Sequence, residues 1–268
     1  MGFVTVNGVR LFYEEAGGGR PLVLLHGWGT SGRVWGAQVP DLARDHHVIT
    51  LDWRGCGRSE RPATGNTISG VVRDILGFID ALDLPAPVLV GSSIAGAFVI
   101  EAAHTEPDRI GGIVPVGAGV HYFSQGKDEQ MSGLLAGLRT DRAGTLAAIV
   151  PNWFRPGTGA ALHDWTVHQI LDSGVFIDEL ISDQAHYDPR PYLGELRVPV
   201  TFLHGALDAE IPREIPEECA ALIPGAEAVF IDGAGHMAQQ DRPDDFTRAL
   251  RAAVRRMSTP ADVSRASA

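Results

Sequence analysis

A serine, an aspartate and a histidine of this chain could together perform nucleophilic catalysis. Ser93, Asp208 and His236 each stand shortly after a short apolar run. A serine hydroxyl is a poor nucleophile by itself, and it needs a base, most often a histidine that a carboxylate holds in place. Taken singly, each of the three has an ordinary explanation as a turn or surface-loop residue. Their combination after three apolar runs makes them candidates for one site.

The elements that must position these residues are short strands. A run that is apolar throughout suits a parallel strand covered by helices on both faces. In open sheets of this kind, ligands bind outside the carboxyl ends of the strands. The runs that lead to the serine, the aspartate and the histidine are Val88–Val90, Val200–Leu203 and Ala228–Ile231.

Strands and helices alternate along most of the chain. This alternation predicts an α/β fold, a mostly parallel sheet with helices on both faces, led in by an antiparallel hairpin around Asn7-Gly8. The predicted strands are Val4–Val6, Val9–Tyr13, Pro21–Leu25, Val48–Leu51, Val88–Val90, Ile110–Val116, Pro199–Leu203 and Ala228–Ile231, and the predicted helices are 68–82, 94–106, 214–222 and 243–256.

The alternation stops over residues 120–196. That segment is too long for a plain loop and is rich in aromatic residues, so we expect short helices that form a cap over the site. The alternative is a segment whose aromatic side chains only pack against one another. The core then comprises residues 1–119 and 197–257. The tail, 258–268, is small and polar, and we expect it to be disordered.

The segment around Ser93 resembles the nucleophile elbow of the α/β-hydrolases, whose pattern is G-x-S-x-G. Gly91 stands two residues before Ser93, and Ala95 stands two residues after it in place of the usual glycine, followed by Gly96. Ser92 fits the pattern less well, because neither residue two positions away from it is small. The resemblance covers nearly the whole chain to about residue 257 and is weakest in the cap.

The resemblance assigns roles to the three residues. Members of the family carry the nucleophile, the acid and the histidine in that order along the chain, which implies Ser93 as nucleophile, Asp208 as the acid and His236 as the general base. Glu210 and Asp232 lie near the acid and base loops. We interpret both as solvated neighbours.

Two further loops match loops of the family. His26-Gly27-Trp28-Gly29 resembles the oxyanion loop, and by analogy the backbone N–H groups of Trp28 and Ile94 form the oxyanion hole. His26 is interpreted as structural. The loop Asp52–Ser59 is expected to hold other loops near the site.

Composition narrows the range of partners. The chain has 22 basic and 33 acidic residues, a net charge of −11, without basic clusters. These features argue against nucleic acid or an anionic membrane as a partner, and they make a polyanionic substrate less likely. The apolar, aromatic cap suggests a small to medium, largely uncharged molecule as the substrate. No apolar stretch is long enough to span a bilayer, and the N-terminus lacks the features of a signal peptide. We therefore expect a cytoplasmic protein.

No metal or cofactor is predicted. His163 and His168 are five residues apart, which suits one helix face poorly, and no glycine run has the phosphate-loop pattern. Cys56 and Cys219 form no metal-type spacing and no disulfide framework.

The predicted function is that of a serine hydrolase, a carboxylesterase or lactonase that cleaves a small to medium, largely apolar substrate through an acyl-enzyme. Perhydrolases and C–C bond hydrolases of the family share the same parts, although Ser93-Ile94-Ala95 departs from the usual perhydrolase elbow. Serine at position 93 argues against epoxide hydrolases and haloalkane dehalogenases, which use aspartate. From another class, a ligand-binding sensor with little turnover stays possible on this fold.

Overall fold

The computed structural model describes residues 1–257 and centres on an eight-stranded sheet. The strand order is β1-β2-β4-β3-β5-β6-β7-β8. β1 and β2 form an antiparallel hairpin, β2 pairs antiparallel with β4, and all pairs from β4 to β8 are parallel. The predicted mostly parallel sheet is therefore confirmed. The strands are β1 Gly2–Val6, β2 Val9–Ala16, β3 Arg20–Leu25, β4 His46–Asp52, β5 Val88–Ser92, β6 Gly112–Val116, β7 Thr201–Gly205 and β8 Glu227–Ile231. The prediction for 258–268 lies outside the described residues.

The turn between β1 and β2 shows how local sequence sets this fold. Asn7 and Gly8 have φ angles of 51° and 79°. Positive φ at both positions is the requirement of a type I′ turn, which asparagine and glycine tolerate best. The turn places Val6 opposite Val9 and so fixes the register of the hairpin.

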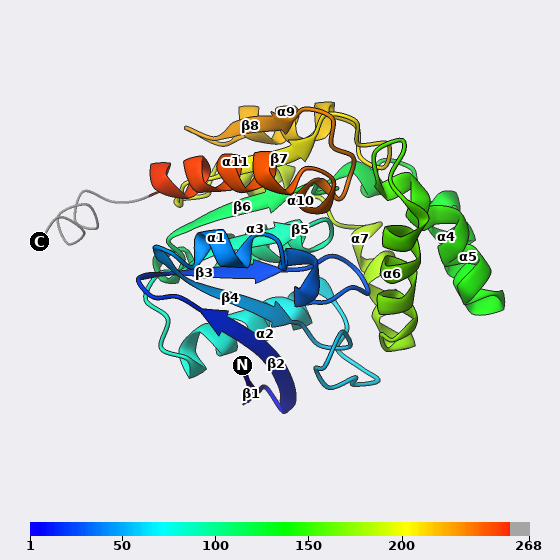
Figure 1. The fold of residues 1–268 in the computed structure, drawn as a ribbon, viewed down its shortest axis with the longest axis horizontal. Helices are drawn as coiled ribbons and strands as arrows, with labels where there is room; N and C mark the ends of the chain where they lie inside the picture. Colours follow the sequence, from blue (N-terminus) through cyan, green and yellow to red (C-terminus); the bar gives the residue numbers. More distant parts are fainter. Residues whose placement is uncertain (258–268) are drawn as a thin grey trace, which may run out of the picture.

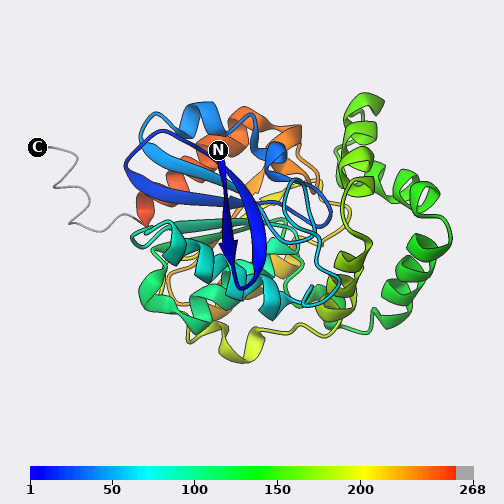
Figure 2. The same cartoon turned by 90° about the horizontal axis from the view of Figure 1, so that it is seen from below.

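Helices cover both faces of the sheet, as predicted. On one face α1 (Val39–Leu42) packs against α11 (Pro243–Arg256), and on the other α2 (Ile68–Ala81) packs against α3 (Ala95–Thr105). Figure 2 shows the sheet between these two pairs. Near its far edge, α9 (Glu214–Leu222) packs on β7 and β8. Because both faces are covered, the inner strands are mostly apolar and buried in succession rather than alternating, as Pro21–Leu25 of β3 and Val88–Val90 of β5 illustrate.

The segment between β6 and β7 contains helices. Figure 1 shows its longer helices beyond the tips of the strand arrows, at the end of the sheet where the parallel strands finish. Two of the short helices also contact the core, α7 through α2 and α8 through α9. The helices are α4 Asp128–Thr140, α5 Arg142–Ile149, α6 Ala160–Leu171, α7 Glu179–Gln184 and α8 Arg190–Leu193.

A buried ion pair ties the loop after β4 to α2. The Arg54 guanidinium donates two hydrogen bonds to the carboxylate of Asp74, Nε to Oδ2 at 2.6 Å and Nη2 to Oδ1 at 2.8 Å. Their side chains are only 8% and 1% exposed. Asn7 Nδ2 also donates to Asp74, at 3.1 Å, so the hairpin joins the same network. A charge buried this deeply depends on its partner.

We expect Asp74→Ala to destabilise the protein by about 3 kcal/mol, because it leaves the buried Arg54 guanidinium without its counterion. Asp80→Ala is the matched control. It removes an aspartate from the same helix, but Asp80 pairs with Arg109 at the surface, with 68% of its side chain exposed, and the expected loss is within about 1 kcal/mol. Urea denaturation of both variants makes the comparison. Equal losses would contradict a special role for the buried pair.

Candidate active site

Ser93 occupies a strained turn between β5 and α3. Its φ angle is 55°, in the left-handed region that residues with a side chain rarely adopt. Two hydrogen bonds hold this conformation: the Ser93 N–H donates to the carbonyl of Val116 at 2.7 Å, and the Gly96 N–H donates to the carbonyl of Ser93 at 2.9 Å. Strain of this kind persists where surrounding structure enforces it, and it is common at active sites.

Two glycines make the turn possible. A Cβ added to Gly91 would lie 2.2 Å from the carbonyl oxygen of Ala95, and one added to Gly96 would lie 2.3 Å from the Cβ of Ala118. A side chain at Gly91 would therefore force β5 and α3 apart, and one at Gly96 would force α3 away from the loop after β6. The close approach involves the backbone of Ala95 rather than its side chain, which explains why the turn tolerates alanine there.

The structure brings Ser93, His236 and Asp208 together in one hydrogen-bonded chain. His236 Nε2 lies 3.0 Å from Ser93 Oγ, and His236 Nδ1 lies 2.9 Å from Asp208 Oδ2. Ser92 points elsewhere: its buried hydroxyl accepts a long hydrogen bond, at 3.5 Å, from Gln239 Nε2. The residues that the sequence singled out thus meet in the nucleophile, base and acid arrangement.

The Asp208 carboxylate is fixed by its own loop. Its Oδ1 accepts hydrogen bonds from the N–H groups of Glu210 and Ile211, at 2.8 and 2.9 Å. Oδ2 faces His236, with His204 Nε2 at 3.5 Å, and only 1% of the side chain is exposed. The carboxylate that hydrogen-bonds His236 is therefore that of Asp208, and not that of Glu210 or Asp232.

Burial and charge oppose each other in this pair. Burial favours the neutral form of each group, but the Asp208 carboxylate outweighs it at His236 and raises the pKa of that imidazole, with a smaller contribution from Glu210. Burial likewise acts to raise the pKa of Asp208, but His236, His204 and the Ile211 N–H lower it overall. Asp208 is therefore ionised over the pH range in which His236 titrates.

Trp28 and Ile94 are the residues whose backbone amides the sequence predicts as oxyanion donors. Trp28 and Ile94 line the same cavity as Ser93 and His236. Within residues 1–257, neither N–H donates a hydrogen bond to another protein group. Nearby, His26 is fully buried and stacks on the ring of Trp53 at 5.0 Å, and burial lowers its pKa to about 4. Such an imidazole stays neutral at physiological pH.

The cavity over Ser93 has a volume of about 410 Å³. Its floor comes from the core and its walls from the segment between β6 and β7, so that segment stands over the candidate site. Most of the wall is apolar, which suits a small organic molecule. The residues that line it are Trp28, Ser93, Ile94, Phe123, Gln130, Met131, Leu134, Thr145, Ile149, Asn152, Trp153, Ile181, Gln184, Glu210 and His236.

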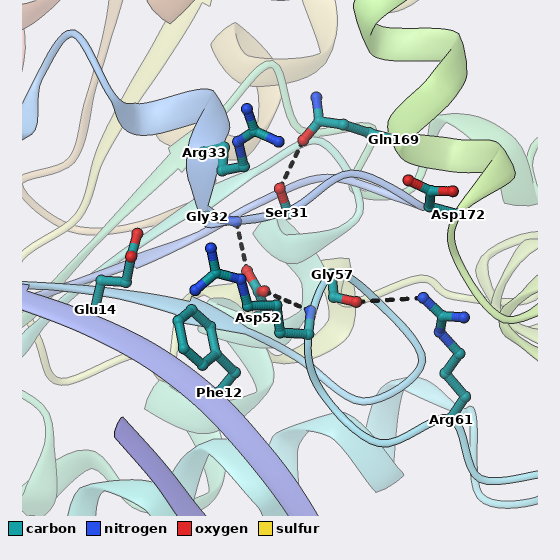
Figure 3. Close-up of a pocket in the computed structure, with 11 residues that line it drawn as sticks. Phe12, Glu14, Ser31, Gly32, Arg33, Asp52, Gly57, Arg61, Gln169 and Asp172 are labelled. Carbon is teal, nitrogen blue, oxygen red and sulfur yellow. Dashed lines mark hydrogen bonds between the residues drawn. The ribbon is translucent and has the colours of Figure 1, made fainter. Parts of the chain in front are cut away.

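A smaller cavity of about 190 Å³ lies around Asp52, away from Ser93 and His236 (Figure 3). There the Asp52 carboxylate accepts hydrogen bonds from the N–H groups of Gly32 and Arg58, at 2.7 and 2.9 Å. Asp52 thus joins the loop after β3 to the loop after β4, which agrees with the predicted structural role of 52–59.

The described residues, 1–257, contain neither a metal-binding group of side chains nor a membrane-spanning helix. Neither His163 and His168, both on α6, nor any other His, Cys, Asp or Glu residues in this range form a group of three that could hold a metal ion. In the same range, no helix combines the length and the apolar character needed to cross a membrane.

Comparison with known proteins identifies relatives over most of the chain. A family model described as the alpha/beta hydrolase fold matches residues 20–243. The pimeloyl-[acyl-carrier protein] methyl ester esterase of Edwardsiella ictaluri is 28% identical, with 90% of this chain and 95% of that protein covered. The 2-hydroxy-6-oxo-6-(2'-aminophenyl)hexa-2,4-dienoic acid hydrolase of Metapseudomonas resinovorans is 27% identical, with 99% and 93% covered. Among solved structures, a bromoperoxidase from Bacillus anthracis is 27% identical, with a TM-score of 0.87 and 92% and 96% covered.

The structure adds one residue that the sequence led us to set aside. We interpreted Glu210 as a solvated neighbour, but it lines the cavity with Ser93 and His236 and its charge raises the pKa of His236. Its spacing of two residues from Asp208 was the available signal. Asp232, by contrast, is exposed, as predicted.

We expect Ser93 to react with a fluorophosphonate probe faster as the pH rises through a midpoint above the ordinary histidine value of 6.5. Only neutral His236 can accept the Ser93 proton. Because the pKa of His236 is raised, the rate of reaction with the probe should increase on the alkaline side of 6.5. Glu210→Gln should move the midpoint to lower pH, whereas Glu214→Gln, an exposed change of equal charge, should leave it in place. A midpoint below 6 in the wild type would contradict this account.

Proposed function

The chain belongs to the alpha/beta hydrolase family, and we propose that it is a serine hydrolase that cleaves a carboxylic ester or lactone of a small to medium, largely apolar substrate. One observation carries the proposal: the hydrogen-bonded chain Ser93–His236–Asp208 opens into an apolar cavity of about 410 Å³. The named methyl ester esterase among the relatives supports the same class of reaction.

The proposed reaction has two halves. Ser93 Oγ attacks the ester carbonyl carbon while His236 Nε2 takes its proton, and Asp208 stabilises the imidazolium that forms. The amides of Trp28 and Ile94 donate hydrogen bonds to the oxyanion of the tetrahedral intermediate. His236 then gives its proton to the leaving alkoxide. Water, activated by the same histidine, cleaves the acyl-enzyme and releases the acid.

We propose that residues 120–196 act as a cap on a core formed by 1–119 and 197–257. The support is that Phe123, Leu134, Trp153 and Ile181, all from this segment, line the cavity above Ser93. A cap that closes over the site excludes water and gives apolar contacts to the substrate. The cavity volume favours one small to medium molecule rather than a polymer.

The residues that line the cavity over Ser93 favour an ester as substrate. They favour it over a carboxylic acid such as the dienoic acid in the name of the Metapseudomonas resinovorans relative. A dienoic acid substrate carries a carboxylate, and a site that binds it gains from a cationic partner. No Lys or Arg is among the lining residues of this cavity in the part of the chain that the structure describes. C–C bond hydrolysis and perhydrolysis, the latter suggested by the bromoperoxidase relative, remain the alternatives on the same triad.

The proposal for cellular location, cofactor and partners follows the sequence predictions. We propose a cytoplasmic enzyme that acts on a small molecule, needs no metal or cofactor, and binds neither nucleic acid nor membrane. The support is the acidic composition and the two cysteines, Cys56 and Cys219, which are both free and buried. Ser-His-Asp chemistry itself requires no Lewis acid.

We expect Ser93→Ala to abolish turnover of a short p-nitrophenyl ester, a loss on the order of a million-fold in kcat, because the nucleophile is gone. Ser92→Ala is the matched control, since its hydroxyl is buried and faces Gln239, and it should retain most of the activity. The reverse result would move the nucleophile to Ser92. A wild type that releases p-nitrophenol at most once per protein molecule would favour the sensor function instead.

Asp208→Asn should lower kcat by roughly ten-thousand-fold with the fold intact, because the amide cannot stabilise the imidazolium and can favour the wrong tautomer. Asp232→Asn, a matched change at an exposed residue of the base loop, should be close to wild type. Steady-state rates and circular dichroism of both variants make the test. Near-normal activity in Asp208→Asn would place the acid elsewhere.

A further inference from the structure

We infer that Glu210 determines substrate charge at this site: its carboxylate selects esters that carry an ammonium group on an otherwise apolar body. The inference rests on the proposed ester hydrolysis and adds to it the class of substrate. It begins from an asymmetry in the cavity, where one free negative charge stands in a wall that is otherwise uncharged around the catalytic pair.

The backbone of Glu210 is held firmly while its side chain stays free. The Glu210 N–H donates to Asp208 Oδ1 at 2.8 Å, so the same contact that fixes the acid also fixes the position of Glu210. Its carboxylate makes no hydrogen bond or ion pair with another side chain among residues 1–257, although the residue is half-buried and lines the cavity. A carboxylate placed in this way is available to a ligand.

No lysine or arginine among the described residues that line the cavity offsets the charge of Glu210. Beyond Ser93 and His236, the other lining residues are apolar or carry neutral polar groups, such as Gln130 and Asn152. One cation lies behind the wall: the Arg142 guanidinium is 5.5 Å from the centre of the Trp28 ring. It does not line the cavity, and the carboxylate of Asp178 holds it at 2.6 Å. Among the described residues that line the cavity, Glu210 therefore supplies the one carboxylate, and no lysine or arginine offsets it.

Aromatic rings in the same cavity favour the same charge. Trp28, Phe123 and Trp153 line it, and the Trp153 ring lies 6.4 Å from that of His236. The negative faces of aromatic rings attract ammonium groups, and sites for quaternary ammonium ligands are often built from them. A carboxylate beside aromatic rings is thus a suitable environment for an ammonium group with apolar substituents.

The influence of Glu210 reaches the reacting groups. Its charge contributes to the raised pKa of His236, so the carboxylate lies close enough to that imidazole for their charges to interact. A cation bound near the same carboxylate is stabilised, and an anion is repelled by the same amount. The order of preference among esters of one shape should therefore be cationic, then neutral, then anionic.

The test compares esters that differ in charge and hardly in shape. Choline butyrate and 3,3-dimethylbutyl butyrate differ by one nitrogen for one carbon on the alcohol side. Methyl 4-(trimethylammonio)butanoate and methyl 5,5-dimethylhexanoate differ in the same way on the acyl side. The measurement is kcat/KM for all four, by titration of the released acid, at a pH well above the His236 midpoint, where His236 is neutral in every enzyme form.

In at least one pair, we expect the wild type to prefer the cationic ester, and Glu210→Gln to reduce that preference roughly fivefold to tenfold. Glu214→Gln removes the same charge from the exposed start of α9 and should leave the preference unchanged. The ratio within a pair cancels any general loss of activity in a variant. As a second measurement on the wild type alone, added salt should raise KM for the preferred cationic ester more than for its neutral partner.

The outcomes separate this inference from the proposed function. If the wild type cleaves the neutral esters through Ser93 but neither cation preference changes in Glu210→Gln, the inference is wrong and the proposed function stands. The same holds if Glu210→Gln loses all activity and salt affects both esters of each pair equally. If the wild type cleaves none of the four esters and no p-nitrophenyl ester, both fall together.

Discussion

The hydrogen bond between Asp208 and His236 depends on two loops that approach each other very closely. A Cβ added to Gly205 would lie 1.9 Å from the carbonyl oxygen of Gly235, so the ends of the acid and base loops touch through their backbones. β7 and β8, which lead into these loops, are parallel neighbours that finish at the same edge of the sheet. The geometry of the pair therefore follows from sheet topology, and a glycine makes the final approach possible.

Ser93, the third residue of the site, reaches the same edge of the sheet through the strained turn after β5. β5 lies two strands away from β7, with β6 between them, and the Ser93 turn spans the interval because its N–H bonds the end of β6 at Val116. The cost of the left-handed backbone at Ser93 is of the order of 1 to 3 kcal/mol. The packing of β5 and α3 against β6 must offset it. The stability of the core and the position of Ser93 are thus linked.

Much of this could be predicted from the sequence, and the reasons differ from element to element. The apolar runs of β3 and β5 are distinctive because strands covered on both faces need no polar alternation, and Asn7-Gly8 specifies its turn through local conformation alone. The strand ends were less certain: β6 begins at Gly112, and β7 extends to Gly205, since pairing with neighbouring strands sets these limits. The short helices α1 and α10 (Ala238–Asp241) carried too little periodicity to be predicted. That Glu210 lines the cavity depends on contacts between distant parts of the chain, and its spacing of two residues from Asp208 was the one local signal.

Asp208 and Glu210 lie in one loop, and their different burial gives their carboxylates different roles. Every position around the Asp208 carboxylate is taken by an N–H group or an imidazole, and its side chain is 1% exposed. Such a group can orient a neighbour and stabilise its charge, but it has no capacity left for a ligand. Glu210 lines the cavity, and within residues 1–257 its carboxylate has no hydrogen bond or ion pair with another side chain, so it can contribute a charge without fixing a geometry. The two are coupled, because the Glu210 N–H is one of the donors that hold Asp208 in place. A change in the side chain at 210 can therefore alter substrate preference while the backbone contact that supports the acid is kept.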